Sequence, residues 1–185
     1  IHLERTYGEL WYALATAEAL EKLHSAHDAA MVAYRLKNTV SPFGTVTRGV
    51  CEAENGVLRS VRETYKIKLF PDGTIRDTER GEDGPLLDPD TLVSMNLWGC
   101  HPEALRRMED YFAAFLASLA PDDMKSECLL PTMMGELTDK GEIAINVLST
   151  REKWFGLTYR EDKPGVIAAL TELHEKGVYP DALWK

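Results

Sequence analysis

The sequence predicts an α/β fold, in which a mixed, mostly parallel sheet is layered with helices. Apolar segments of strand length alternate along the chain with longer segments whose apolar residues recur at helical spacing. A hairpin signal, Asn55-Gly56, adds an antiparallel insertion near the middle of the chain. With 185 residues the chain can fill one core, so we expect a single α/β domain over residues 1–185.

The stretch 31–68 predicts three strands around one loop. Residues 31–36 form a short apolar run, which is typical of a strand buried on both faces. Residues 38–44 contain Pro and Gly and predict a turn, because Pro removes a backbone donor and Gly accepts positive φ. Residues 45–54 and 57–68 then form the two strands of the hairpin.

The remaining elements follow from the same patterns. Helical spacing of apolar residues predicts four helices, at about 9–24, 101–121, 126–137 and 164–177. Pro at a first-turn position marks the second helix, and Ser126 is a candidate cap for the third. Further strands are expected at 92–99, 143–148 and around Ile75, and the Gly-, Pro- and acid-rich stretch 78–89 is expected to be an exposed loop.

The turn at 38–44 lies at the mouth of the predicted sheet and is followed across the hairpin by Glu63 and Lys66. A tight Gly-containing loop beside a carboxylate and an ammonium group is a candidate pocket for a polar ligand. Asn96 interrupts an apolar strand, and a buried amide without a partner costs about 1–3 kcal/mol. It either bonds to neighbouring backbone or faces a pocket, and the sequence leaves both alternatives open.

Composition excludes some classes of partner. The net charge of −9 argues against nucleic-acid binding, which needs clustered Lys and Arg to neutralise phosphates. No apolar run approaches membrane-spanning length and no basic-then-apolar leader is present, so we expect no membrane partner. The chain begins at Ile1, within an element already under way, and we therefore expect it to be a fragment of a longer protein.

The three cysteines predict free thiols. Cys51, Cys100 and Cys128 are odd in number and lack CxxC spacing, which favours a reducing compartment and a cytoplasmic protein. Zinc at Cys100-His101 with Cys128 is the alternative, but the spacing does not aim several ligands at one point. Buried structural thiols are the preferred interpretation.

Three stretches carry a resemblance to a known family. They are AYRLKNTVSPFGTVTRGVC with VRETYKI behind it, the strand LVSMNLWG, and SECLLPTMMGEL leading to WFGLTYREDKPGV. Their order and spacing resemble the sugar nucleotidyltransferase (nucleoside-diphosphate-sugar pyrophosphorylase) family over nearly the whole chain. The resemblance implies a Rossmann-like nucleotide-diphospho-sugar transferase fold whose N-terminal part is missing.

The resemblance also implies a reaction and a set of site residues. A sugar 1-phosphate attacks the α-phosphate of an NTP and pyrophosphate leaves, with Mg²⁺ and cationic side chains neutralising charge. By position in the family motifs, the substrate-binding residues would be Gly44, Thr45, Glu63, Lys66, Asn96 and Lys163. The metal-binding carboxylates would be Glu4 and Asp162, with Glu161 as an alternative to Asp162.

The chain departs from the family in two respects. No Gly-rich loop of the GxGxR kind is present, so we expect that this chain alone lacks the nucleotide cradle, is inactive, and self-associates through uncovered surface. The metal-binding carboxylates are also poorly matched. Two other hypotheses follow: a non-catalytic module that binds or senses a sugar nucleotide, and an α/β domain in which Glu63 and Lys66 form only a cross-strand ion pair.

Overall fold

A computed structural model describes residues 21, 28–156 and 159–177 of the chain. The described strands are β1 (Asp28–Arg35), β2 (Val46–Glu54), β3 (Val57–Leu69), β4 (Ile75–Asp77), β5 (Leu92–Cys100) and β6 (Ala144–Ser149). The described helices are the short 3₁₀ helix η2 (Leu36–Asn38) and the α-helices α2 (Pro102–Ser118), α3 (Leu130–Asp139) and α4 (Asp162–Glu175). The predicted helix at 9–24 lies outside the described residues, except for Glu21, which is helical.

Five strands form a closed ring. The order is β2-β5-β1-β6-β3, and β3 pairs with β2 to complete the circuit, while β4 is attached to β3. Within this sheet β1 and β6 are parallel and the other pairs are antiparallel. The predicted Rossmann-like, mostly parallel sheet layered with helices is therefore wrong: the structure is a small closed barrel with three α-helices among its described residues.

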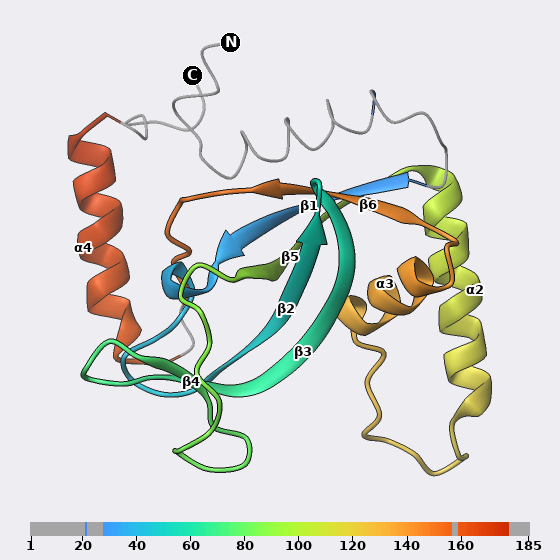
Figure 1. Cartoon of the computed structure of the whole chain (residues 1–185), viewed down its shortest axis with the longest axis horizontal. Helices are drawn as coiled ribbons and strands as arrows, with labels where there is room; N and C mark the ends of the chain where they lie inside the picture. The colour runs from blue at the N-terminus through green and yellow to red at the C-terminus, as the bar shows by residue number, and fades with distance from the viewer. Residues whose placement is uncertain (1–20, 22–27, 157–158, 178–185) are drawn as a thin grey trace.

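The long hairpin strand β3 is the physical reason for the closed ring. It has 13 residues and pairs in turn with β6 at Val57, with β2 along most of its length, and with β4 at its end. The β2–β3 ladder contains two register shifts, and bulges of this kind bend a strand and increase its twist. Figure 1 shows β3 curving around the front of the sheet toward β6. Strands β2 and β3 pair antiparallel through a hairpin, and β3 bends to reach β6. These strands therefore do not need the helical crossovers that connect the strands of a parallel sheet.

The hairpin turn was predicted correctly. Asn55 and Gly56 have φ values of 53° and 79°, which are the positive angles of a type I′ turn. The Gly56 carbonyl also accepts a 2.8 Å hydrogen bond from the Val147 amide of β6, so the turn itself closes the ring.

Strand β1 is buried on both faces, as its apolar run predicts. Ala29, Met31 and Ala33 belong to one core cluster, which includes residues of α2 and α3. Val32 and Tyr34 belong to a second cluster, which includes residues of β2, β3, β4 and β5. All five are at most 4% exposed. Two cores on opposite sides of one strand explain why β1 has hardly any polar residues.

The helices cover the sheet unevenly. Figure 1 places α2 and α3 together on one side of the sheet and α4 on the other. Helix α3 packs closely on β3 because Gly135 has no side chain: a Cβ there would lie 3.1 Å from the Val61 Cγ1 atom. The predicted start of α3 at Ser126 is wrong, because Ser126 donates a 2.6 Å hydrogen bond to Asp123 and the helix begins at Leu130.

Within the part of the chain that the structure describes, no helix has the length and apolarity needed to cross a membrane.

Substitution of two methionines tests how much the packing of α3 contributes to the stability of the protein. Met134 is fully buried and Met124 is 90% exposed. We expect Met134→Ala to lower the free energy of unfolding by about 2–5 kcal/mol, because it removes buried contacts and leaves a cavity. Met124→Ala is the matched control and should change it by less than about 0.5 kcal/mol. Urea unfolding measures both, and equal effects would contradict the described packing.

Candidate functional site

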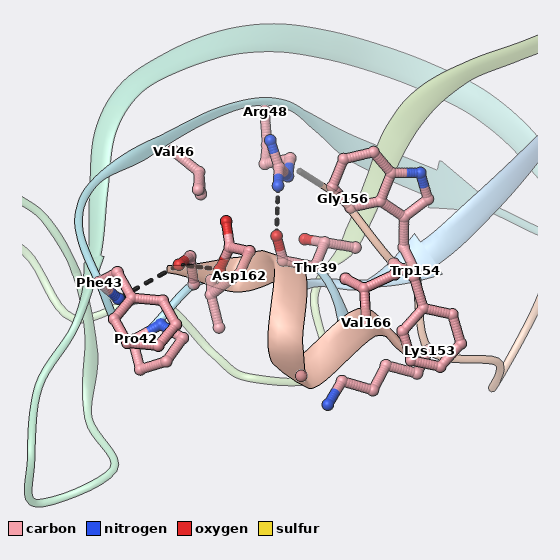
Figure 2. A pocket seen from close by; sticks show the side chains of 14 residues that line it. Thr39, Pro42, Phe43, Val46, Arg48, Lys153, Trp154, Gly156, Asp162 and Val166 are labelled. Atoms are coloured by element: carbon pink, nitrogen blue, oxygen red, sulfur yellow. Dashed lines mark hydrogen bonds between the residues drawn. The ribbon is translucent and has the colours of Figure 1, made fainter. Parts of the chain in front are cut away.

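A buried arginine is the most unusual polar residue of the barrel. Arg48 lies on β2 between Val46 and Val50 and is 8% exposed. Its guanidinium group donates to the Thr47 carbonyl oxygen at 2.7 Å and to the Thr39 carbonyl oxygen, and it lies 5.2 Å from the centre of the Trp154 ring. Figure 2 shows the guanidinium of Arg48 between Thr39 and Trp154. Burial lowers the Arg48 pKa to about 10, so the side chain remains cationic at neutral pH.

Glu63 lies on the neighbouring strand and faces the same region. It is paired with Gly49 in the β2–β3 ladder, next to Arg48 in sequence. Its Oε2 atom is buried and has no hydrogen-bond donor among the described residues. Desolvation raises the Glu63 pKa, and the positive charge of Arg48 partly opposes that rise. The carboxylate therefore offers an acceptor that the described part of the protein does not use.

Asn96 completes this part of the site. Strand β5 bulges between its pairs with β1, where Met31 lies opposite Trp98 and Ala33 lies opposite Ser94. At the bulge Asn96 has a φ of 61°, a left-handed conformation that Asn tolerates better than most residues. The backbone N–H of Asn96 donates to the Ser94 hydroxyl oxygen at 3.2 Å. Local strain of this kind is found preferentially at functional sites.

These three side chains line one hollow of about 220 Å³. The full lining consists of residues from β2, β3, β5, the start of α3 and the segment after β6: Thr47, Arg48, Gly49, Glu63, Ser94, Met95, Asn96, Pro131 and Trp154. We call this hollow the sheet pocket. It combines a cation, a carboxylate, an amide and an aromatic ring within a small volume.

A second hollow of about 280 Å³ shares Arg48 and Trp154 with the sheet pocket. Figure 2 shows this loop pocket, with Phe43 and Val46 at one end and Val166 and Lys153 at the other. Its walls come from the turn at 39–43, the segment 153–156 and the first turns of α4. Arg48 and Trp154 therefore stand between two adjoining hollows.

The structure brings together only some of the residues singled out in the sequence. Glu63 and Asn96 share the sheet pocket. Asn96 is exposed and lines this hollow, so of the two alternatives left open for Asn96 the structure has the position at a pocket. Lys66 is exposed at a bulge, has a φ of 54°, and lines neither hollow. Lys163 is exposed on α4 and also lies outside both hollows. Glu63 and Lys66 lie on the same strand, so they do not face each other across the hairpin.

Gly44 and Thr45 lie against the side chain of Tyr159. The Tyr159 hydroxyl donates a 2.7 Å hydrogen bond to the Thr45 carbonyl oxygen, and a side chain at Gly44 would collide with the Tyr159 ring. Both residues therefore anchor the segment before α4 to the turn at 38–44. Neither lines the sheet pocket.

Of the two carboxylates that the family resemblance implies for Mg²⁺, the structure describes one, Asp162. Asp162 accepts hydrogen bonds from the Ser41 hydroxyl at 3.0 Å and from the Tyr159 amide at 2.8 Å, so each carboxylate oxygen already has a protein partner. Glu4 lies outside the described residues. No group of three or more His, Cys, Asp or Glu side chains suited to a metal occurs in the described part of the chain. Mg²⁺ takes its octahedral oxygen ligands from one or two carboxylates together with waters and substrate phosphates, and of the two carboxylates expected here the structure describes only Asp162.

Arg48 and Trp154 were not identified in the sequence. The signal for Arg48 was a charged residue at an inward position of an alternating strand, between Val46 and Val50. Trp154 gave no local signal, because its role depends on a 3.0 Å hydrogen bond from its amide to the Asn38 carbonyl oxygen, which joins segments far apart in the chain.

No protein-family model matches this chain, and a search of curated proteins finds no match to it.

The unpaired carboxylate predicts a specific pH dependence. The Glu63 pKa is raised in the folded state above its ordinary value of 4.5, so the native carboxyl group holds its proton more tightly than the unfolded one. Stability from this group is therefore lost as pH rises through 4.5 to the raised pKa. We expect wild type to lose stability relative to Glu63→Gln as the pH rises above 4.5, measured by urea unfolding at a series of pH values.

Glu109 provides the control, because it is exposed on α2 and away from the pocket residues. Glu109→Gln should keep the pH dependence of wild type. A wild-type protein that gains stability relative to Glu63→Gln over this range would show that the carboxylate is well paired in the native state.

Proposed function

We propose that this chain binds the sugar 1-phosphate in a sugar nucleotidyltransferase reaction. In that reaction a phosphate oxygen of the sugar 1-phosphate attacks the α-phosphorus of an NTP. A new P–O bond forms, the bond from the α-phosphorus to the bridging oxygen breaks, and pyrophosphate leaves with the electron pair. The observation that carries the proposal is the meeting of Arg48, Glu63 and Asn96 in the sheet pocket beside Trp154.

Glu63 is suited to a sugar because its free oxygen needs a donor. An ionised carboxylate only accepts hydrogen bonds, and sugar hydroxyls donate them. A buried acceptor without a partner costs about 1–3 kcal/mol. In this proposal a bound hydroxyl removes that cost at Oε2, the atom that lacks a donor in the described protein. The pocket is therefore complementary to a polyol rather than to an apolar ligand.

Asn96 adds the second kind of hydrogen-bonding group. Its side-chain amide both donates and accepts, so it can bond to a hydroxyl in either role. The bulge at Asn96 places this residue on the lining of the pocket. In this proposal the strained backbone serves to present the amide to the sugar ring.

Arg48 supplies the positive charge. Two of its donor bonds go to the Thr39 and Thr47 carbonyl oxygens, which fixes the orientation of the guanidinium group. A fixed cation in a partly desolvated site attracts an anion more strongly than one in water. Lys153, on the lining of the loop pocket, is a second cation near the phosphate. We assign the phosphate to this side of the site, since Lys66 and Lys163 lie outside both hollows.

A non-catalytic module that binds a sugar nucleotide is the second candidate. The observation that favours it is the structural engagement of Asp162, whose oxygens hold Ser41 and Tyr159 in place. A module of this kind would use the same sheet pocket without a metal carboxylate.

A cytoplasmic location belongs to the same proposal. All three cysteines are unpaired, which suits a reducing compartment where NTPs and sugar phosphates are available.

Thermal unfolding with a panel of sugar 1-phosphates and NDP-sugars tests the proposal. A ligand that binds only the native state stabilises it by about 2.7 kcal/mol at 100 times its Kd. We expect a selective rise in the unfolding midpoint with at least one sugar 1-phosphate, and loss of that rise in Glu63→Ala and Glu63→Gln.

Glu109→Gln is the matched control and should respond to the sugar phosphate as wild type does. A Glu63→Gln protein that folds and keeps the full ligand response would refute the assigned site. The panel is run with and without Mg²⁺, because a response that requires Mg²⁺ favours the transferase and a response indifferent to Mg²⁺ favours the module.

A further inference from the structure

A third hollow, of about 380 Å³, is lined by three cationic side chains. They are Arg35, Lys37 and Arg151, and Asn38 and Asp90 complete the lining. We propose that this cationic hollow binds an oligophosphate, an anion with two or more linked phosphate groups. The proposal rests on these five residues and does not depend on the function proposed for the sheet pocket.

The parallel strand pair brings two of the cations together. Strands β1 and β6 run in the same direction, and Ala33 lies opposite Ser149 in their register. Arg35 and Arg151 each follow two residues later, so they emerge side by side where both strands end. Lys37 follows on η2, directly after β1. Three positive charges therefore converge from segments that are more than 110 positions apart in the sequence.

Hydrogen bonds to backbone carbonyl oxygens hold these segments in place. The Asn38 side-chain amide donates to the carbonyl oxygens of Arg151 at 2.8 Å and Glu152 at 3.1 Å. The Lys37 amide donates to the Pro89 carbonyl oxygen at 2.9 Å. The cations are thus attached to fixed backbone rather than to a free loop, and preorganisation of this kind lowers the entropy cost of binding.

The charges in the hollow do not balance. Asp90 Oδ1 lies 3.1 Å from Arg35 Nη1 and 2.7 Å from Lys37 Nζ, and it is the only carboxylate among the lining residues. The hydrogen bond and charge of Lys37 hold the Asp90 pKa below its ordinary value, so Asp90 is ionised at neutral pH. Three cations and one anion leave an excess of two positive charges, in a chain whose net charge is −9.

Phosphate is the group that fits this arrangement. Arg presents a planar fork of donors that matches two phosphate oxygens, and Lys adds a point charge. A single carboxylate already occupies part of the hollow between Arg35 and Lys37, which shows where one anionic oxygen is accommodated. Arg151 has no ion-pair partner among the described residues and is the group available to a second anionic centre. Two linked phosphates engage all three cations, whereas one carboxylate engages two.

The cationic hollow adjoins the site described above through the segment that follows β1. The Asn38 carbonyl oxygen accepts the Trp154 amide hydrogen bond, and the Thr39 carbonyl oxygen accepts one from Arg48. One short segment therefore has an oligophosphate site on one side and the pocket residues on the other.

Isothermal titration with inorganic pyrophosphate in metal-free buffer tests this site on the full chain. We expect saturable binding at one site. Arg151→Gln should weaken it about tenfold, because a hydrogen bond to a charged group is lost. Asp90→Asn should strengthen it, because a competing carboxylate is removed. Arg80→Gln changes the net charge equally at an exposed loop position and should leave binding unchanged.

Titration with a nucleoside triphosphate distinguishes the two sources of the anion. Pyrophosphate that binds at least as tightly identifies the free anion as the occupant, and a tighter triphosphate that is weakened by Arg151→Gln identifies a nucleotide. Glu63→Gln should not affect either titration, which separates this site from the sheet pocket. Absence of saturable binding, or equal weakening by Arg80→Gln and Arg151→Gln, would overturn the proposal.

Discussion

Strand β3 imposes the constraint on which the rest of the structure depends. It must pair with β2 along the hairpin and also reach β6 at Val57, and a straight strand cannot do both. The register shifts in the β2–β3 ladder allow the bend, and closure leaves the five ring strands paired on both sides. Helix α3 depends on the same strand, because Gly135 packs directly against Val61. The position of Pro131 at the sheet pocket follows from that packing.

Closure also explains how a cation came to be buried. A barrel wall turns every second side chain of β2 inward, and Arg48 occupies one of these positions. Its burial is tolerable because the Thr39 and Thr47 carbonyl oxygens accept hydrogen bonds from the guanidinium group and the Trp154 ring stacks on it. Arg48 and Glu63 each keep one buried atom, Nε and Oε2 respectively, without a hydrogen-bond partner among the described residues. A protein retains such an imbalance most readily where a ligand supplies the missing partner.

Local patterns predicted local features well. The turn at Asn55-Gly56, the doubly buried β1 and the bounds of most strands follow from side-chain period and turn chemistry, which act over a few residues. The α/β layering failed because alternation of strands and helices is compatible with more than one pairing order, and only β1 and β6 pair in parallel. The candidate site was predicted only in part, because its position also depends on how the strands pair. Glu63 stands out as a charged residue in a strand, whereas Lys66 lies in a bulge that no sequence pattern marks.

Among the described residues, the sequence by itself determined which segments are strands and helices, apart from ends such as the start of α3, where the hairpin turns, and which types of residue are available for binding. These properties depend on backbone preference and on apolar period, both of which are local. The tertiary structure decided that the sheet closes, that Arg48 and Trp154 stand between two hollows, and that Arg35 and Arg151 meet across parallel strands. Each of these depends on contacts between residues distant in the chain, and such contacts are fixed by packing and register rather than by any single segment.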